Sequence, residues 1–236
     1  MKKLLLILLF LPFIGFGQVW EQILNSAASG ESIHQTNDGG YIITGETYNN
    51  IPLLKTDANG ILEWQKLFNA YEGEGKVVNQ TNDGGYIIFA TDYGSSPQEI
   101  YIIKTDIYGN SQWERRYDGI VTDGQKTNDG GYILCARESG GIAHFIMKLG
   151  SDGYEEWRKY HQVLSVRQTI DEGYIATGNN LLVKIDENGN SQWSQPFGAN
   201  SVRQTQDQGF VTLSQNSSNS VIVSKYNNTG NEEWSQ

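Results

Sequence analysis

The sequence has 236 residues with 17 basic and 27 acidic side chains, which give a formal net charge of −10 at neutral pH. It has no run of lysine or arginine, so nucleic acid and anionic membrane surfaces are poor partners. The single cysteine, Cys135, excludes an intrachain disulfide. Its place in an apolar run predicts a small packed strand residue, with a nucleophile as the alternative.

Residues 1–17 are predicted to be a secretory signal peptide. Lys2 and Lys3 precede an apolar stretch at 4–16, and glycines stand three and one places before a cleavage site at Gln18. The apolar stretch is too short to span a bilayer comfortably. We therefore expect export, no membrane span, and a mature chain, 18–236, that forms one domain.

A motif of the type Gln-Thr-Asn-Asp-Gly-Gly-Tyr-Ile-Ile occurs five times. The copies begin at Gln35, Gln80, Lys126, Gln168 and Gln204. Asp-Gly and Gly-Gly supply the positive-φ residues of a tight turn, so each copy predicts a β-hairpin. The aspartates are Asp38, Asp83, Asp129, Asp171 and Asp207. We expect each to cap its own turn or to pair with a nearby lysine. The alternatives are general acids or Ca²⁺ ligands.

A second motif follows each hairpin. A lysine closes an apolar run, a glycine comes five residues later and a tryptophan nine residues later. The lysines are Lys55, Lys104, Lys148, Lys184 and Lys225, and the tryptophans are Trp64, Trp113, Trp157, Trp193 and Trp234. This spacing predicts a second hairpin and four strands per unit. We expect the tryptophans to wedge between units and the lysines to pair with turn carboxylates, rather than to stack on sugars or ring an anion.

The hairpin aromatics at positions 41, 86, 132, 174 and 210 are spaced 36 to 46 residues apart, with no helical periodicity between them. This spacing with four short strands per unit predicts an all-β fold, a β-propeller of about five four-stranded blades. A sixth tryptophan strand at 19–24, containing Trp20, has no lysine strand before it. The blade count is therefore five or an incomplete six.

The two motifs together, best seen from Ile102 to Trp113, resemble the β-propeller repeats of secreted bacterial proteins, the SBBP-like class. The resemblance covers nearly all of the mature chain. It implies a secreted or surface-located propeller, often part of a larger protein that ends in a sorting domain. No catalytic residues are shared in that class, so the resemblance implies a fold and no chemistry.

The leading functional hypothesis is a secreted, non-enzymatic binding or scaffold module for glycans or surface proteins, acting as a monomer without cofactor or metal. Variable loops on a repeated frame are the usual place for binding. The aromatic side chains Tyr48, Tyr71 and Tyr93 lie in such loops. The predicted ligand-binding ring contains His34, Asn79, Gln125, Arg167 and Arg203, which are polar residues on the innermost strands. Solvated channel lining is the alternative for these five.

The rival hypothesis is an enzyme that acts on polysaccharide with a carboxylate pair. Such a site must use residues present in one copy only. The candidates are Glu46, Glu99, His144 and His161, which share no recognisable spacing. No phosphate loop, metalloprotease motif or nucleophile elbow occurs. The sequence therefore favours a non-enzymatic protein. It also disfavours a Ca²⁺ site, because the turn at Asp57 lacks a terminal acidic ligand.

Overall fold

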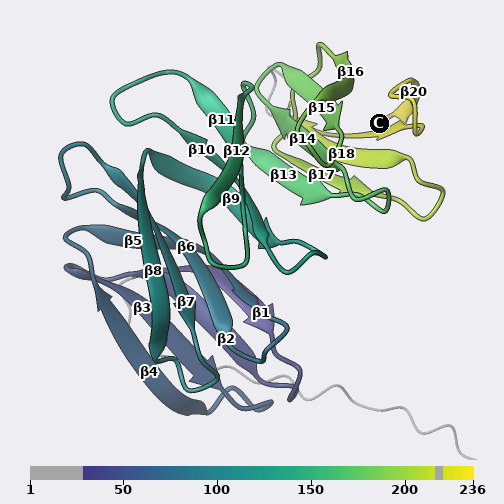
Figure 1. Ribbon diagram of the computed structural model, residues 1–236. Coiled ribbons are helices and arrows are strands. Elements are labelled where there is room, and N and C mark those ends of the chain that lie inside the picture. Colours follow the sequence, from purple (N-terminus) through teal and green to yellow (C-terminus); the bar gives the residue numbers. More distant parts are fainter. Residues whose placement is uncertain (1–28, 216–219) are drawn as a thin grey trace, which may run out of the picture.

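The computed structural model describes residues 29–215 and 220–236 (Figure 1). These residues form twenty strands and no helix, which confirms the predicted all-β class. The predicted signal peptide and the strand of Trp20 lie outside the described residues. The twenty strands fall into five consecutive groups of four, which we call blades 1 to 5.

Each blade is an antiparallel meander whose strands follow the chain from the innermost to the outermost. Blade 1 contains β1 (Ser29–Gln35), β2 (Tyr41–Glu46), β3 (Asn50–Thr56) and β4 (Leu62–Asn69). Blade 2 contains β5 (Gly73–Gln80), β6 (Tyr86–Asp92), β7 (Glu99–Thr105) and β8 (Ser111–Asp118). Blade 3 contains β9 (Ile120–Lys126), β10 (Tyr132–Arg137), β11 (His144–Leu149) and β12 (Glu155–Tyr160). Blade 4 contains β13 (Ser165–Gln168), β14 (Tyr174–Gly178), β15 (Leu181–Ile185) and β16 (Ser191–Gln195). Blade 5 contains β17 (Ser201–Gln204), β18 (Phe210–Gln215), β19 (Val221–Tyr226) and β20 (Glu232–Ser235).

The repeated motif forms the hairpin between the first two strands of each blade, as predicted. In blade 3, Tyr132 pairs with Lys126 across the hairpin, and Gly130 has a φ of 83° in the turn. In blades 4 and 5 the same turn position is occupied by Glu172 and Gln208, which also have positive φ. The turn geometry is therefore kept even where glycine is absent.

Blades 1 and 2 are joined into one eight-stranded sheet, which the sequence did not predict. The junction is a single residue pair between Glu46 at the end of β2 and Glu74 in β5. The strands of blade 2 are long, with eight residues in β5 and seven in β6, so β5 extends far enough to meet β2. The other three blades are separate four-stranded sheets.

The core lies between successive blades. Each blade has a trailing face, which packs on the next blade along the chain, and a leading face, which packs on the preceding one. Between blades 2 and 3, for example, Phe89 and Ile102 pack with Tyr132 and Met147 in one buried cluster. These strands are covered on both faces, which explains their nearly continuous apolar runs.

The tryptophan of each of blades 1 to 4 packs on the next blade, as predicted. Trp113 lies 5.9 Å from the ring of Tyr132 and also contacts Gly153 in the second hairpin of blade 3. The matching aromatic pairs are Trp64–Tyr86, Trp157–Tyr174 and Trp193–Phe210, at 5.6 to 5.9 Å. Four tryptophans thus occupy equivalent places, and inter-blade contact rather than sugar stacking explains them.

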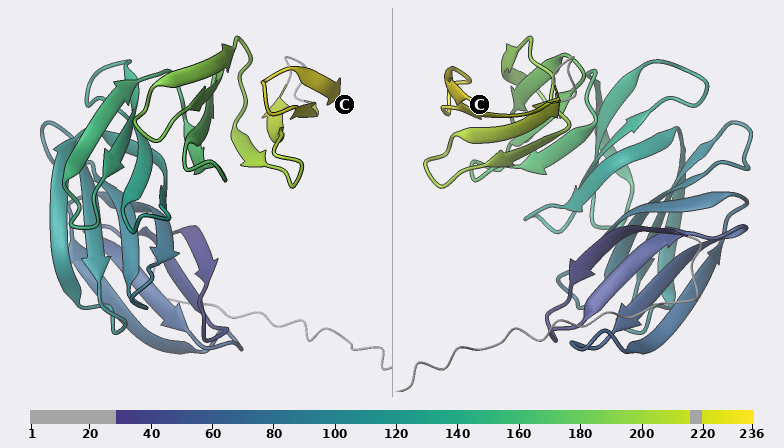
Figure 2. Two further views of the ribbon diagram at one scale, coloured as in Figure 1. Left: turned by 45° about the vertical axis from the view of Figure 1, so that its right-hand side comes forward. Right: turned by 180° about the vertical axis from the view of Figure 1, so that it is seen from behind.

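The blades follow one another in an arc (Figure 2). The innermost strands β1, β5, β9, β13 and β17 pack each on the next. Within the described residues, β17 has no comparable packing on β1. The described part of the chain is therefore an open, propeller-like arc of five blades.

Candidate functional site

The meander divides the connections between two faces of the molecule. The turns within both hairpins of every blade lie on one side, which we call the turn face. The connections from second to third strand and from blade to blade lie on the opposite side, which we call the loop face. Repeated sequence thus gathers on the turn face and variable sequence on the loop face.

The repeated aspartates are turn caps paired with lysine. Asp83 accepts hydrogen bonds from the Thr81 hydroxyl at 2.6 Å and the Gly85 N–H at 3.1 Å, and its second oxygen lies 2.7 Å from Lys104 Nζ. The equivalent ion pairs are Lys55–Asp38, Lys148–Asp129, Lys184–Asp171 and Lys225–Asp207, at 2.7 to 2.9 Å. The structural interpretation of both residue sets is confirmed.

These contacts hold the carboxylates in their charged form. Hydrogen bonds from Thr36 and Lys55 lower the pKa of Asp38 to about 2. Burial alone would raise the pKa of Asp83, but the hydrogen bonds from Lys104 and Thr81 outweigh it and lower the pKa to about 2. A carboxylate with so low a pKa is a poor general acid at neutral pH.

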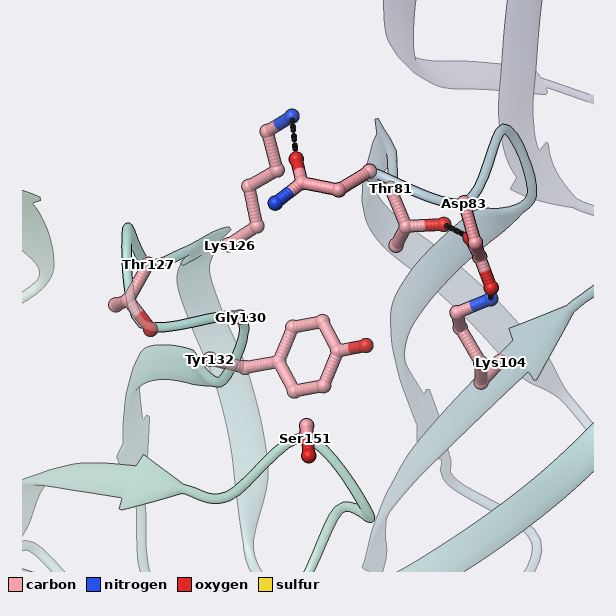
Figure 3. Close-up of a pocket in the computed structure, with 9 residues that line it drawn as sticks. Thr81, Asp83, Lys104, Lys126, Thr127, Gly130, Tyr132 and Ser151 are labelled. Carbon is pink, nitrogen blue, oxygen red and sulfur yellow. Dashed lines mark hydrogen bonds and ion pairs between the residues drawn. The ribbon is translucent and has the colours of Figure 1, made fainter.

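A pocket of about 200 Å³ lies on the turn face between blades 2 and 3 (Figure 3). Asp83 and Lys104 meet on one wall, and the ring of Tyr132 projects toward them from the other blade. Lys126 of blade 3 donates a hydrogen bond to the Asn82 side chain of blade 2 at 3.1 Å, which bridges the two walls of the pocket. The charged groups Asp83, Lys104 and Lys126 all have partners within the frame, so the pocket is part of the inter-blade junction.

The predicted ring of innermost residues is only partly brought together. His34, Asn79 and Gln125 line one cavity of about 440 Å³, whereas Arg167 and Arg203 lie outside its lining. Arg167 instead forms an ion pair with Asp123 at 2.5 Å, and Arg203 donates to the carbonyl of Val202.

Much of this inner region is occupied by contacts between blades. Gln80 and Gln168, for example, each accept the N–H of a turn residue in the preceding blade at 2.8 Å. Burial and the nearby charge of Lys126 lower the pKa of His34, so this imidazole is neutral at neutral pH. These contacts fit the channel-lining alternative.

A second cavity, of about 400 Å³, opens on the loop face between blades 1 and 2. We call it the tyrosine cleft. Its lining residues are Glu46, Thr47, Tyr48, Glu72 and Tyr93. Tyr48 is 78% exposed, and it comes from the β2–β3 connection, whereas Tyr93 comes from the β6–β7 connection. Residues singled out separately in the sequence therefore converge here.

Tyr93 is held in place by a part-buried hydrogen bond. Its hydroxyl donates to Glu74 at 2.9 Å, and Lys76 lies 2.8 Å from the other oxygen of that carboxylate. Burial and the hydrogen bond to Glu74 raise the pKa of Tyr93 to about 12, so the phenol stays protonated. Tyr71 borders this region, since its carbonyl accepts the N–H of Gly94 at 2.8 Å.

Glu72, like Thr47, is a lining residue that the sequence did not single out. It lies in the connection between blades 1 and 2, with a φ of 54°. The other two non-glycine residues with positive φ occupy the repeated hairpin turn, where the motif explains them. Glu72 lies in a separate turn, which the Gly73 N–H closes on the Ala70 carbonyl at 3.2 Å, and positive φ is ordinary at the third position of such a turn. In the structure this connection is only residues 70–72, because β5 begins at Gly73, so its length gave no signal that singled out Glu72.

The lining of the cleft carries chemical groups of the kinds that contact sugar rings. Aromatic faces such as that of Tyr48 stack on apolar ring faces, and the carboxylates of Glu46 and Glu72 accept hydrogen bonds from hydroxyl groups. Neither carboxylate has an ion-pair partner among the described residues. Both are therefore available to a ligand.

The remaining enzyme candidates are not gathered at this cleft. Glu99 accepts from Arg116 at 2.8 Å, in a cluster that also includes Asp92. The Nδ1 of His144 lies 3.1 Å from the carbonyl of Val163, and the backbone N–H of His161 donates to the carbonyl of His144. Of the four candidates, only Glu46 lines the tyrosine cleft.

Metal ligation, membrane insertion and cysteine chemistry are three further possibilities for a site. Within residues 29–215 and 220–236, no three His, Cys, Asp or Glu side chains are grouped so as to hold a metal ion. The same residues include no helix that is long and apolar enough to cross a bilayer. Cys135 is fully buried, and burial raises the pKa of its thiol well above the usual value, as expected for a packed strand residue.

Known structures share the fold. No protein-family model matches the chain, and no curated protein matches it either. A protein of unknown function from Bacteroides caccae has a TM-score of 0.61 at 12% identity, over 92% of this chain and 84% of that one. A catalytically inactive virginiamycin B lyase from Staphylococcus aureus, with quinupristin, has a TM-score of 0.60 at 14% identity, over 89% of this chain and 70% of that one. A streptogramin B lyase has a TM-score of 0.58 at 16% identity, over 85% of this chain and 69% of that one. The chain is propeller-like.

Proposed function

We propose that the protein is a secreted, non-enzymatic β-propeller that binds glycans through the tyrosine cleft. The observation that supports this most is the convergence of Tyr48, Tyr93, Glu46 and Glu72 in one loop-face cavity. Glu46 ends β2, and the other three residues come from loop-face connections whose sequences differ from blade to blade. Export is inferred from the N-terminal sequence, and the glycan class from the pairing of aromatic rings with unpaired carboxylates.

The proposal is tested with an array of immobilised neutral and charged glycans, followed by titration calorimetry with the glycan that binds best. Tyr48→Ala removes the exposed ring, and we expect about fivefold weaker binding, since a stacked ring contributes about 1 kcal/mol. Tyr93→Phe removes the hydroxyl that donates to Glu74. It should weaken binding less, because the ring remains.

Tyr108→Ala is the matched control. Tyr108 is a 68% exposed tyrosine on the turn face, so its loss should leave binding unchanged. Replacement of the five inner-ring residues by alanine tests the other predicted location. If binding is lost when the five inner residues are replaced but kept in Tyr48→Ala, the binding site lies in the central channel and not in the tyrosine cleft.

The rival enzymatic function is tested in the same samples. Release of new reducing ends from a bound polysaccharide, abolished in Glu46→Gln or Glu72→Gln, would identify a carboxylate enzyme and overturn the non-enzymatic assignment. Binding without release of product supports the proposed function.

A further inference from the structure

The turn-face junction between blades 3 and 4 contains a pocket of about 480 Å³, which we call the acidic pocket. It corresponds to the smaller pocket between blades 2 and 3, because the repeat supplies both walls of each. An aspartate, a lysine and a tyrosine are common to the two pockets. In the acidic pocket these are Asp129, Lys148 and Tyr174, and in the smaller pocket they are Asp83, Lys104 and Tyr132. Three further lining positions differ, and each difference changes the charge of the pocket.

All three differences make the acidic pocket more negative than its counterpart. The equivalent residues, with that of the smaller pocket first, are Lys126 and Gln168, Gly130 and Glu172, and Ser151 and Glu187. A fourth carboxylate, Glu156, stands where blade 2 has Gln112. The smaller pocket is therefore lined by one carboxylate and two lysines, whereas the acidic pocket is lined by four carboxylates and one lysine.

The lysine neutralises only part of this charge. Lys148 Nζ lies 2.7 Å from Asp129 and 3.1 Å from Glu156. Glu172 and Glu187 have no ion-pair partner among the described residues. Their carboxylates accept hydrogen bonds from neutral side-chain amides at 3.1 to 3.4 Å. Two carboxylates of the pocket therefore lack a cation.

The hydroxyl of Tyr174 is an independent indication of a ligand. The residue is 1% exposed, with its ring 5.9 Å from that of Trp157, and it lines the pocket. Its hydroxyl has no hydrogen-bond partner among the described residues, although buried polar groups usually have one. Burial, followed by the charges of the four carboxylates, raises the pKa of Tyr174, so the phenol stays protonated. The oxygen of a protonated phenol can accept an N–H from a ligand.

The placing of the carboxylates indicates which class of cation fits. Among the residues that the structure describes, no three acidic side chains are close enough to one another to hold a metal ion. The carboxylates instead line the wall of a cavity of small-molecule size, which suits a ligand with several separate positive groups. We propose that the acidic pocket binds an organic polyamine, whose ammonium groups pair with Glu172 and Glu187 and donate to the Tyr174 hydroxyl. This site lies on the face opposite the tyrosine cleft and does not depend on glycan binding.

Titration calorimetry of the mature chain with spermidine, a triamine, tests the proposal at low salt. Butylamine is the comparison ligand, because it has a single ammonium group. We expect one saturable spermidine site per chain. Butylamine should bind about tenfold more weakly, since it forms fewer ion pairs.

The repeat itself supplies the substitutions for this test. Glu172→Gly introduces the residue that blades 1 to 3 have in the same left-handed turn, and Glu187→Ser introduces the residue of blade 3. Both residues are compatible with the blade, and circular dichroism checks that the variants fold. Each variant should bind spermidine about threefold more weakly, and the double variant about tenfold more weakly. Tyr174→Phe keeps the ring and removes the hydroxyl, so it should also cost about threefold.

Glu232→Gln is the matched control, because Glu232 is an exposed carboxylate in β20 and its loss changes the net charge by the same amount. It should leave spermidine binding unchanged. The absence of saturable spermidine binding would overturn the proposal. So would equal weakening in Glu232→Gln and in the pocket variants, because binding would then follow the charge of the whole chain. Displacement of spermidine by an equal concentration of Mg²⁺ would overturn it as well, since a single metal ion would then be the better ligand.

Discussion

At the scale of single residues, glycines at equivalent φ have different roles. Gly109 and Gly130 have φ values of 76° and 83°, a region in which a side chain is strained. A Cβ at Gly130 would meet no heavy atom within 4 Å, whereas at Gly109 it would lie 2.7 Å from the Trp64 ring. Gly130 therefore serves only the backbone turn, and Gly109 serves the turn and also makes room for the indole.

This difference is testable by alanine substitution. Gly130→Ala should lower the free energy of unfolding by about 1–2 kcal/mol, the cost of left-handed backbone. Gly109→Ala should cost a further 1–3 kcal/mol or so, because the indole must move. Urea unfolding of the two variants gives the comparison. Equal losses would show that Trp64 does not depend on the space at Gly109.

At the scale of strands and blades, the outer strand of one blade stabilises the next through its tryptophan. The indole ring packs on the aromatic residue in the first hairpin of the following blade. The indole N–H adds a hydrogen bond. Trp157 and Trp193 each donate to a carbonyl in the second hairpin of the following blade, at 3.2 Å. One residue thus ties together both hairpins of its neighbour.

Trp113→Ala should therefore lower the free energy of unfolding by about 3–5 kcal/mol, as for other large aromatic deletions in a core. Trp234→Ala should cost less than about 1 kcal/mol, since nearly half of that side chain is exposed. Chemical denaturation measures both. A similar loss in the two variants would contradict the role assigned to the inter-blade contact.

The five sequence repeats made the blade architecture and the contacts between blades predictable. Aspartate turns, lysine pairs and tryptophan wedges recur at fixed spacing, so five copies specify one contact pattern. The tyrosine cleft was not predictable as a unit, because it forms where connections of unequal length meet and no second copy shows how they fold. Glu72 was missed for that reason. Arg167 was assigned to a ring, but its partner Asp123 occurs in one blade only and could not be inferred from the repeat.

At the scale of the whole molecule, the blades form a chain of neighbours in which stability depends on adjacent contacts. The middle blades are covered on both faces. Blade 5 is covered only on its leading face, where Phe210 and Tyr226 are buried against blade 4. The two ends of the arc make no comparable contact within the described residues. Local opening should therefore begin at blade 5.

Hydrogen exchange followed by mass spectrometry checks this expectation. Peptides from β18 and β19 should exchange faster than those from β6 and β7, which lie between two blades. The reason is that opening blade 5 exposes one buried face, whereas opening blade 2 exposes two. Uniform protection across the five blades would instead indicate that the whole arc unfolds as one unit.

The separation of the two faces has a consequence for how this architecture diversifies. The ion-paired turns that hold each blade together lie opposite the connections that form the tyrosine cleft. New binding specificities can therefore be introduced by changing segments 47–49, 70–72 and 93–98, because these changes leave the ion-paired turns of the blades unaltered. The same scaffold is suited to loop libraries for selecting binders from a stable, disulfide-free frame.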